Sequence, residues 1–325
     1  MKRRNTLKLL LTGIALCLGL QAHAQNKPPI RLLVGFPPGG STDMVARLLA
    51  DRLRAQLDQT VVVENKPGAG GRVASLALKN SDADGLTYLI MPNASAVLNH
   101  LLYPTETLNY DLLTDMTPVA MVVSYPMGMA VSASLGVNDA RQYVEWVKKS
   151  GRPGLYGTAG QGGQTHFTGL QLGKAADIEM KVVPYRGNGP MLTDLLGGQI
   201  PAGIAVVGDF LQHVKDGKLR AIGVFGSKRS PLAPDVPTFK EQGFEVDTGD
   251  AWTGMWAPAG TPAAELQRMQ AALKNVLAQA DVRETLERSN MSADYRPAGE
   301  LSGIVRRELD YWGPVIEESG FTPEK

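Results

Sequence analysis

The sequence predicts an α/β protein with two similar lobes. Short apolar runs alternate with helical patterns along nearly the whole chain. The series breaks once, at two consecutive strand-like runs, and then begins again. Glycine- or serine-rich loops join most strands to the helices that follow them. Alternation of this kind is typical of a parallel sheet with helices on its faces, in which ligands bind outside the carboxyl ends of the strands.

The first 24 residues are predicted to be a signal peptide rather than part of the fold. A basic stretch at residues 2–4 precedes an apolar run over residues 7–20, and Ala22-His23-Ala24 matches an A-x-A cleavage site. The arginine pair also fits a twin-arginine signal, so both export routes stay open. We expect a periplasmic protein that is cleaved after Ala24, and a retained N-terminal anchor is the less favoured alternative.

Removal of the signal changes the charge and the cysteine count. The chain has 33 basic and 32 acidic residues, and the signal takes away four basic residues and no acidic one, which leaves a net charge of −3. A nearly neutral surface argues against nucleic acid as a partner. The single cysteine, Cys17, is removed too, so neither a disulfide nor a thiol nucleophile is expected. The remaining 301 of 325 residues suit about two domains of about 150 residues each.

The first series of elements runs from residue 30 to residue 102. Strands are predicted at 32–34, 61–64 and 87–91, and the helices that follow them at 43–57, at 73–78 and up to about 102. An irregular loop over 103–115 ends the series. Two strand-like runs, 119–123 and 127–132, then follow each other directly and predict a crossover into a second lobe.

The second series repeats the same order of elements. Its strands are predicted at 155–157, 181–183, 202–206 and 219–225, and its helices at 138–149, 166–176, 189–196 and 208–216. A proline-rich linker at 230–237 precedes a returning strand at 252–256. Thr261 is predicted to cap a helix with Pro262 at its first position, and later helices at 281–288 and 302–318 are expected to return to the first lobe. The predicted domains are residues 25–124 and 246–325 for the first and 125–245 for the second.

Motifs that would indicate an enzyme or a nucleotide site are missing. The stretch from Gly39 to Asp43 lacks the last glycine of G-x-S-x-G, and no Walker A motif is found. The G-x-G-x-x-G pattern fails at 68–73 and at 160–165. Three histidines remain after cleavage, without metal-ligand spacing. We therefore predict no catalytic residue, no cofactor and no metal. An exported enzyme or a ligand-binding sensor that uses the same cleft stays as the alternative.

Five loops rich in N–H groups and hydroxyls open predicted helices instead. They lie at 39–43, 68–72, 93–95, 160–166 and 187–189. The first N–H groups of a helix are unpaired and the helix dipole is positive there, which suits a carboxylate. Two lobes with a cleft between them can also close around a ligand by hinge rotation. The residues therefore predict a two-lobed receptor for a small anion.

The chain also resembles the substrate-binding receptors of tripartite tricarboxylate transporters, the Bug-type periplasmic proteins. The resemblance extends from about residue 30 to the C-terminus. It is carried by blocks such as Phe36-Pro-Pro-Gly-Gly-Ser-Thr-Asp43, Val63-Glu-Asn-Lys-Pro-Gly-Ala-Gly-Gly71, Val183-Pro-Tyr-Arg-Gly187 and Ala257-Pro-Ala-Gly-Thr-Pro262. It implies a class II periplasmic binding protein fold that closes over a small carboxylated solute, with membrane permease subunits as partners. It also implies that the loops at 39–43 and 160–166 hold the ligand carboxylate. We expect a monomer.

Several candidate residues have two interpretations. Arg72 stands where many family members have a small or neutral residue, and it either pairs with a second ligand carboxylate or is a solvated arginine at a helix start. Asp209 either favours a ligand with an ammonium or hydroxyl group or caps a helix. His166 lies at the pocket edge or packs inside. Phe36 covers the apolar part of a ligand or is buried at a strand end. Asp43 is interpreted as ordering the helix start.

The full set of predicted ligand-binding residues comes from these loops. It consists of Phe36, Gly39, Gly40, Ser41, Thr42, Asp43, Arg72, Asn93, Ser95, Gly160, Gln161, Gly163, Gln164, Thr165, His166 and Asp209.

Overall fold

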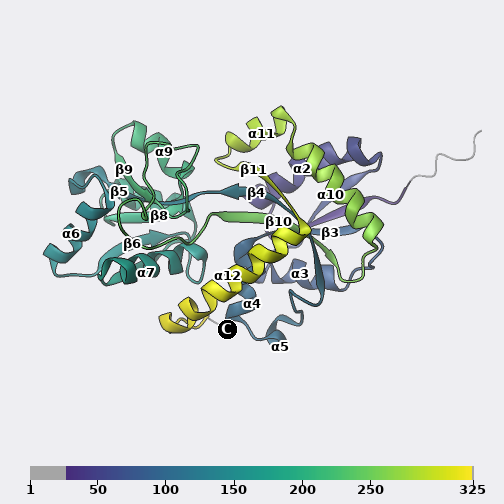
Figure 1. Cartoon of the computed structure of the whole chain (residues 1–325), viewed down its shortest axis with the longest axis horizontal. Helices are drawn as coiled ribbons and strands as arrows, with labels where there is room; N and C mark the ends of the chain where they lie inside the picture. Colours follow the sequence, from purple (N-terminus) through teal and green to yellow (C-terminus); the bar gives the residue numbers. More distant parts are fainter. Residues whose placement is uncertain (1–26, 324–325) are drawn as a thin grey trace, which may run out of the picture.

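The structure, a computed structural model, describes residues 27–323 as two lobes that lie side by side along the long axis (Figure 1). Lobe 1 contains a six-stranded sheet and lobe 2 a five-stranded sheet. The predicted signal peptide and its cleavage site lie outside the described residues. Within residues 27–323, none of the helices combines the length and the apolar character that crossing a membrane requires.

The sheet of lobe 1 has the strand order β11-β4-β10-β3-β1-β2. β1 is parallel to β2 and β3, whereas β10 is antiparallel to both β3 and β4. The first three strands therefore end at one edge, as the alternating pattern predicted. The strands are β1 (Ile30–Val34), β2 (Val61–Asn65), β3 (Thr87–Pro92), β4 (Met116–Tyr125), β10 (Ala251–Pro258) and β11 (Ser292–Pro297).

Helices cover both faces of this sheet because each presents one apolar stripe to it. On one face, α2 and α10 pack against the sheet through residues such as Leu49, Leu53 and Leu273. On the other face, α3 and α12 enclose a second core that contains Trp256 and Trp312. The helices are α2 (Ser41–Leu57), η1 (Ala69–Gly71), α3 (Arg72–Lys79), η2 (Ala94–Leu98, a π-helix), α4 (Asn99–Leu102), α5 (Thr105–Leu108), α10 (Ala263–Leu277), α11 (Ala280–Glu287) and α12 (Ala298–Ser319).

The sheet of lobe 2 has the order β7-β6-β8-β5-β9, in which β6 is parallel to β7 and β8. Tyr143, Tyr156 and Phe239 are fully buried in its main core. Its strands are β5 (Met127–Ser132), β6 (Gly154–Thr158), β7 (Met180–Pro184), β8 (Ala202–Val206) and β9 (Leu219–Val224). Its helices are η3 (Ala133–Leu135), α6 (Ala140–Ser150), α7 (Gln164–Ala176), α8 (Asn188–Leu196) and α9 (Gly208–Lys215).

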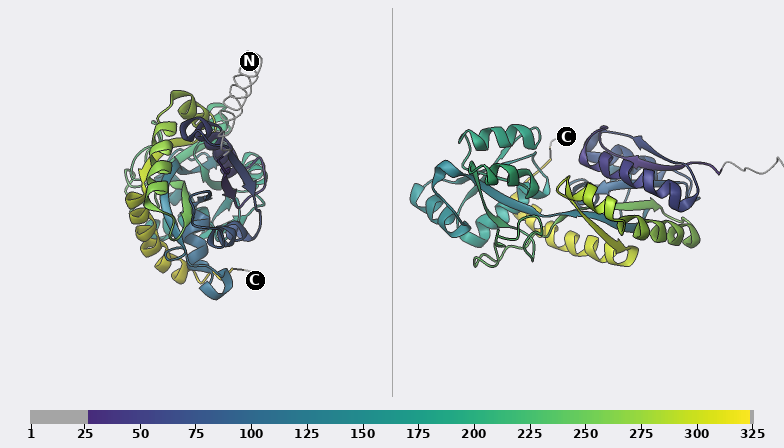
Figure 2. Two further views of the ribbon diagram at one scale, coloured as in Figure 1. Left: turned by 90° about the vertical axis from the view of Figure 1, so that its right-hand side faces the viewer. Right: turned by 90° about the horizontal axis from the view of Figure 1, so that it is seen from above.

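The lobes are joined by more than the two crossover segments. The chain passes from β4 to β5 at Pro126 and returns between β9 and β10. In addition, α12 runs from lobe 1 towards α7 of lobe 2 (Figures 1 and 2). Lys174 of α7 pairs with Glu318 of α12 over 2.7 Å, and Phe167 of α7 packs into the lobe 1 core that contains Trp312. Lobe 2 is therefore held by the C-terminal helix as well as by the two crossover segments.

Three local predictions differ from the structure. The strand β11 was not predicted, because an edge strand paired with β4 alone needs no alternating apolar pattern, and Ser292–Pro297 has none. The short helix α5 lies within the segment that was predicted to be irregular. Thr261 does not cap α10: the N-cap is Pro262, and the Thr261 hydroxyl donates to the Pro258 carbonyl over 2.8 Å instead.

Candidate functional site

The loop after β1 is closed by a buried carboxylate. Gly39 has a φ of +88°, a left-handed value that favours glycine, and its N–H donates to Oδ2 of Asp43 over 2.9 Å. Asp43 is 2% exposed, and it also accepts from Arg47 Nε and Asn65 Nδ2, each over 2.8 Å. The hydrogen bond from Arg47 lowers the pKa of Asp43 to about 2. The predicted role of Asp43 in ordering the helix start agrees with these contacts.

This arrangement leaves the N-terminus of α2 open. Its N-cap is Gly40, with a φ of −78° and a ψ of 170°, and no side chain caps the helix. The first N–H groups of a helix have no partner within it, and the dipole adds partial positive charge there. Ser41 is exposed and Thr42 is buried. The predicted residues Gly40 and Ser41 thus present backbone N–H groups and a hydroxyl at the surface, whereas the N–H of Gly39 is bonded to Asp43.

The loop after β6 has the same construction in lobe 2. Gly162 has a φ of +71°, and its N–H donates to Nδ1 of His166 over 3.1 Å. Gly163 is the N-cap of α7, with a φ of −88° and a ψ of 170°, and again no side chain caps the helix. Because Nδ1 accepts and burial lowers the pKa of His166, the imidazole is neutral and carries its proton on Nε2. His166 is thus packed inside, where it orders the loop.

The exposed part of this second loop lies just before α7 and in its first turn. Gln161 is exposed, and Gly160, Gly163 and Thr165 are half-buried. These residues lie at the carboxyl end of β6, the edge of the lobe 2 sheet that corresponds to the edge where α2 begins in lobe 1.

Two features join the lobes beside these loops. Asn93, the residue before η2, donates through Nδ2 to Oε1 of Gln164, the first residue of α7, over 2.9 Å. Both side chains are buried. A cavity of about 300 Å³ also lies between the lobes. Its lining consists of Gly70, Asn99, Leu102 and Tyr103 of lobe 1, Gln161 and Gly162 of lobe 2, and Phe321 and Pro323 after α12.

Ser95 and Phe36 support the neighbouring loop of lobe 1. The Ser95 hydroxyl donates to the Gly70 carbonyl over 2.8 Å. A Cβ on Gly71, whose φ is +94°, would lie 2.9 Å from the Ser95 hydroxyl oxygen and 3.7 Å from the ring of Phe36. Only glycine at position 71 therefore lets the backbone come this close to the Ser95 side chain. These two predicted residues shape the edge of lobe 1 by packing against Gly70 and Gly71.

Arg72 is engaged within lobe 1. Its guanidinium carbon lies 3.9 Å from the centroid of the Tyr103 ring, and its Nε donates to the Ala69 carbonyl over 2.8 Å. Tyr103 lines the interlobe cavity. Arg72 therefore lies at a helix start, as the second of its two interpretations predicted. It also lies next to one residue that lines the cavity.

Asp209 lies next to the loop that opens α8. Its Oδ2 accepts from Asn188 Nδ2 over 2.6 Å, and burial raises its pKa. The alternative interpretation of Asp209 as a helix cap is wrong, because α9 begins at Gly208 with Val207 as its N-cap. A Cβ on Gly208 would clash with the side chain of Asn290 from lobe 1, so this junction is a further point of contact between the lobes.

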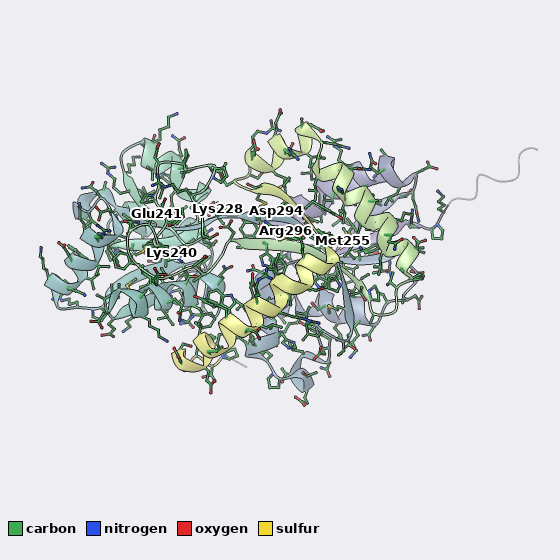
Figure 3. The ribbon with its side chains drawn as sticks, in the orientation of Figure 1. Lys228, Lys240, Glu241, Met255, Asp294 and Arg296 are labelled. Carbon is green, nitrogen blue, oxygen red and sulfur yellow. The ribbon has the colours of Figure 1, made fainter. Side chains whose placement is uncertain are left out.

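Two further cavities lie away from the predicted residues. One of about 520 Å³ lies at the crossover segments and is lined from both lobes, with Lys228 and Asp294 on the two sides of the junction (Figure 3). Another of about 620 Å³ lies on lobe 2 beside Trp146 and Lys181. Neither contains a residue of the predicted set. The candidate site is therefore assigned to the two loops that open α2 and α7, of which the second lines the cavity between the lobes through Gln161 and Gly162. Within residues 27–323, no group of three or more His, Cys, Asp or Glu side chains could hold a metal.

Sequence reasoning missed the residues that support the two loops. Asn65 and Arg47 hold Asp43, and Phe321 packs edge-on against His166 with ring centroids 5.3 Å apart. Glu308 contacts Asn93 across 215 residues of sequence. Such pairings leave no local pattern, and the amphipathic character of α12 was the only signal that its residues face the rest of the protein.

Comparisons with known proteins agree on one family. The model of TctC, the tripartite tricarboxylate transporter family receptor, matches residues 45–321. Protein BugT of Bordetella pertussis is 33% identical over 296 residues, which cover 90% of this chain and 89% of BugT. MatC of Rhodopseudomonas palustris, solved with bound malate, is 29% identical with a TM-score of 0.72, covering 89% of this chain and 98% of MatC. Rpa4515 of R. palustris, solved with adipate, is 28% identical with a TM-score of 0.77, covering 91% and 99%.

Proposed function

This chain belongs to the tripartite tricarboxylate transporter family of receptors, and we propose that it binds a small dicarboxylate between its lobes and delivers it to the permease of such a transporter. The family consists of solute-binding receptors, so the prediction of a receptor rather than an enzyme is confirmed, as is the two-lobed periplasmic binding protein fold. The solved relatives are periplasmic proteins. We further propose that residues 1–24 are removed on export and that the mature receptor is a monomer.

The observation that carries the choice of a dicarboxylate is the pair of uncapped helix N-termini. α2 in lobe 1 and α7 in lobe 2 both begin after a glycine N-cap without a side-chain cap. In the proposed complex one carboxylate lies at each of them, bound by the first N–H groups of the helix. The malate of MatC and the adipate of Rpa4515 both have two carboxylates, which supports this arrangement.

The neutral character of both loops fits the same proposal. The charge of Asp43 is balanced by Arg47, and His166 is neutral. Neither loop therefore requires a ligand cation, and each offers backbone N–H groups to an anion. We expect the Ser41 hydroxyl to bind one carboxylate and the N–H of Thr165 to bind the other, while hinge rotation brings the two lobes together.

The other predicted residues divide by the contacts they make. We propose that Asp209, with one oxygen on Asn188, accepts a hydrogen bond from a ligand hydroxyl or ammonium group through the other. We propose that Arg72 keeps its place on Tyr103 and acts on the ligand through the shape of the 68–71 loop. Residues with side chains engaged inside the protein are proposed to hold the site in shape: Phe36, Asp43, Asn93, Ser95, Gln164 and His166.

The binding assay compares dicarboxylates with monocarboxylates on residues 25–325 by isothermal titration calorimetry. We expect adipate or malate to bind and propionate to bind at least tenfold more weakly, because the second helix N-terminus then has no carboxylate, a difference of about 1.4 kcal/mol. Native mass spectrometry of freshly purified protein is expected to show a retained acid. A chain that no dicarboxylate stabilises in a thermal shift assay would overturn the proposal.

Two variants test the helix starts themselves. Gly40→Ala and Gly163→Ala place a methyl group at each N-cap, where a Cβ would meet only the Pro37 carbonyl oxygen at 3.7 Å or nothing within 4 Å. We expect the fold to tolerate both, because neither methyl group meets a close neighbour, and we expect each to weaken dicarboxylate binding about tenfold. Gly299→Ala, equally free of contacts in the first turn of α12, is the matched control.

In the same assay we expect Arg72→Gln to weaken the binding of monocarboxylates and of dicarboxylates equally. A loss confined to dicarboxylates would instead show that Arg72 pairs with the second carboxylate.

A further inference from the structure

A chain of hydrogen bonds runs from a carboxylate of lobe 1 to the start of α7 in lobe 2. Oε1 of Glu308, on α12, accepts from the indole Nε1 of Trp252 over 2.5 Å, and Oε2 accepts from Asn93 Nδ2 over 3.5 Å. The same Asn93 nitrogen donates to Oε1 of Gln164 over 2.9 Å. Gln164 Nε2 then donates to the Thr248 carbonyl over 3.2 Å. Glu308 is therefore connected, through one asparagine, to the first residue of α7.

The donors and acceptors of this chain can be arranged in only one way. A backbone carbonyl only accepts, so Gln164 turns its NH₂ group to Thr248 and its oxygen to Asn93. Asn93 must then donate, and the same NH₂ group faces Glu308. The indole N–H of Trp252 also can only donate. Both oxygens of Glu308 therefore face donors, which suits a carboxylate, whereas a carboxylic acid would place an O–H against an N–H.

We propose that Glu308 is a positioning residue for the ligand site: as a carboxylate it fixes Asn93, which in turn fixes the N-terminus of α7 relative to lobe 1. The inference rests on the proposed function, in which the start of α7 binds one ligand carboxylate. Protonation of Glu308 removes an acceptor from Asn93 and lets α7 shift. Affinity then falls, because binding has to restore the arrangement first.

The surroundings of Glu308 make this change accessible near neutral pH. Burial raises the pKa of Glu308 to about 7, against the lowering effect of its hydrogen bonds and of Arg307 on the same helix. Burial is the main cause of the raised pKa of Tyr125 on β4, and the nearby charge of Glu308 raises it further. Asn93 and Gln164 add no charge. The carboxylate therefore takes up a proton as the pH falls through about 7.

The first test is the pH profile of adipate binding. If binding requires the carboxylate, Kd rises about tenfold for each pH unit below the pKa, so we expect about a tenfold rise between pH 8 and pH 6. Glu308→Gln keeps the shape of the side chain but places an NH₂ group against one of the two donors, Trp252 Nε1 or Asn93 Nδ2. We expect this variant to bind weakly at both pH values, with a flat profile. Glu317→Gln, exposed on the same helix, should keep the wild-type profile and controls for titration of the ligand.

The second test needs no ligand and so separates this inference from the proposed function. In the free protein, Trp252 emission should titrate with a midpoint near pH 7, and the hydrogen-exchange protection at the start of α7, taken relative to the intrinsic exchange rate at each pH, should fall below that pH. Neither change should occur in Glu308→Gln. A wild-type protein without the titration, or a Glu308→Gln variant that retains the wild-type pH profile, would overturn the role of Glu308. Absence of adipate binding with an intact titration would overturn the proposed ligand alone.

Discussion

The loops that open α2 and α7 share one backbone conformation, but the buried side chain that accepts their hydrogen bond differs in charge. Gly39 and Gly162 both have positive φ, and each donates its N–H to the residue four positions later. That residue is a carboxylate in lobe 1, Asp43, and a neutral imidazole in lobe 2, His166. A glycine N-cap lies between the two partners in both cases. One buried acceptor is thus sufficient to shape an open helix start, and its charge depends on its neighbours.

The two buried acceptors, Asp43 and His166, are held in place by different parts of the fold. Asp43 is held by Arg47 and Asn65, which lie within 22 residues of it in the same lobe. His166 lies against Phe321, which follows α12 at the far end of the chain. The lobe 1 loop is therefore a local structure. The lobe 2 loop is complete only when the C-terminal segment has packed across the junction between the lobes.

Asp43→Ala should break the lobe 1 loop and have the largest effect. It leaves the Gly39 N–H, the Arg47 guanidinium and the Asn65 amide without their shared acceptor, and we expect a loss of about 3 kcal/mol in the free energy of unfolding. Urea denaturation measures this, with the exposed Asp51→Ala on the same helix expected to change stability by less than about 0.5 kcal/mol. A similar loss in both variants would contradict the role of Asp43.

Phe321→Ala should loosen the lobe 2 loop and spare that of lobe 1. A Cβ on Gly162 would already lie 2.9 Å from the Phe321 ring, and the ring also packs on Phe167 with centroids 5.8 Å apart. We expect a loss of about 1–2 kcal/mol. Hydrogen exchange should accelerate over residues 160–166 and remain unchanged over residues 39–43. Equal acceleration in both loops would show that they are not independent, and Leu113→Ala, at an exposed leucine, is the control.

His166→Gln tests the lobe 2 loop through the pH dependence of the free energy of unfolding, and we expect it to have the smallest effect of the three variants. Burial lowers the pKa of His166 in the folded protein, so the unfolded chain takes up the proton first as the pH falls below about 6.5. Stability is therefore lost on acidification, by at most about 1.4 kcal/mol per pH unit. Asp43 acts with the same sign but at lower pH, since its contribution is lost as the pH falls from about 4 towards about 2.

Urea midpoints between pH 7.5 and pH 5.5 measure the contribution of His166. Glutamine can still accept from Gly162 but does not titrate. The wild type should lose more stability than His166→Gln over this range, and identical slopes would exclude a neutral buried imidazole. Taking the difference between the two proteins cancels the titration of Glu308, which is common to both.

The sequence by itself determined the order of the elements and the places where helices begin. Apolar periodicity and glycine-rich junctions are local, so they predicted the two α/β series and the loops at 39–43 and 160–166. The same local character explains the errors. Ser292–Pro297 forms a strand only because β4 offers it an edge, and Thr261 looks like a cap although its hydroxyl bonds to Pro258.

Only the tertiary structure decided what supports each loop and which side chains remain available to a ligand. Asn93 and Gln164 were predicted as ligand-binding residues from their loops, and the fold uses their amides to join the lobes. Glu308 and Phe321 were not predicted at all, because their partners lie far away in sequence and come close only when α12 packs across both lobes. Sequence patterns specify what a segment buries, whereas the partner of a buried polar group depends on how distant segments pack.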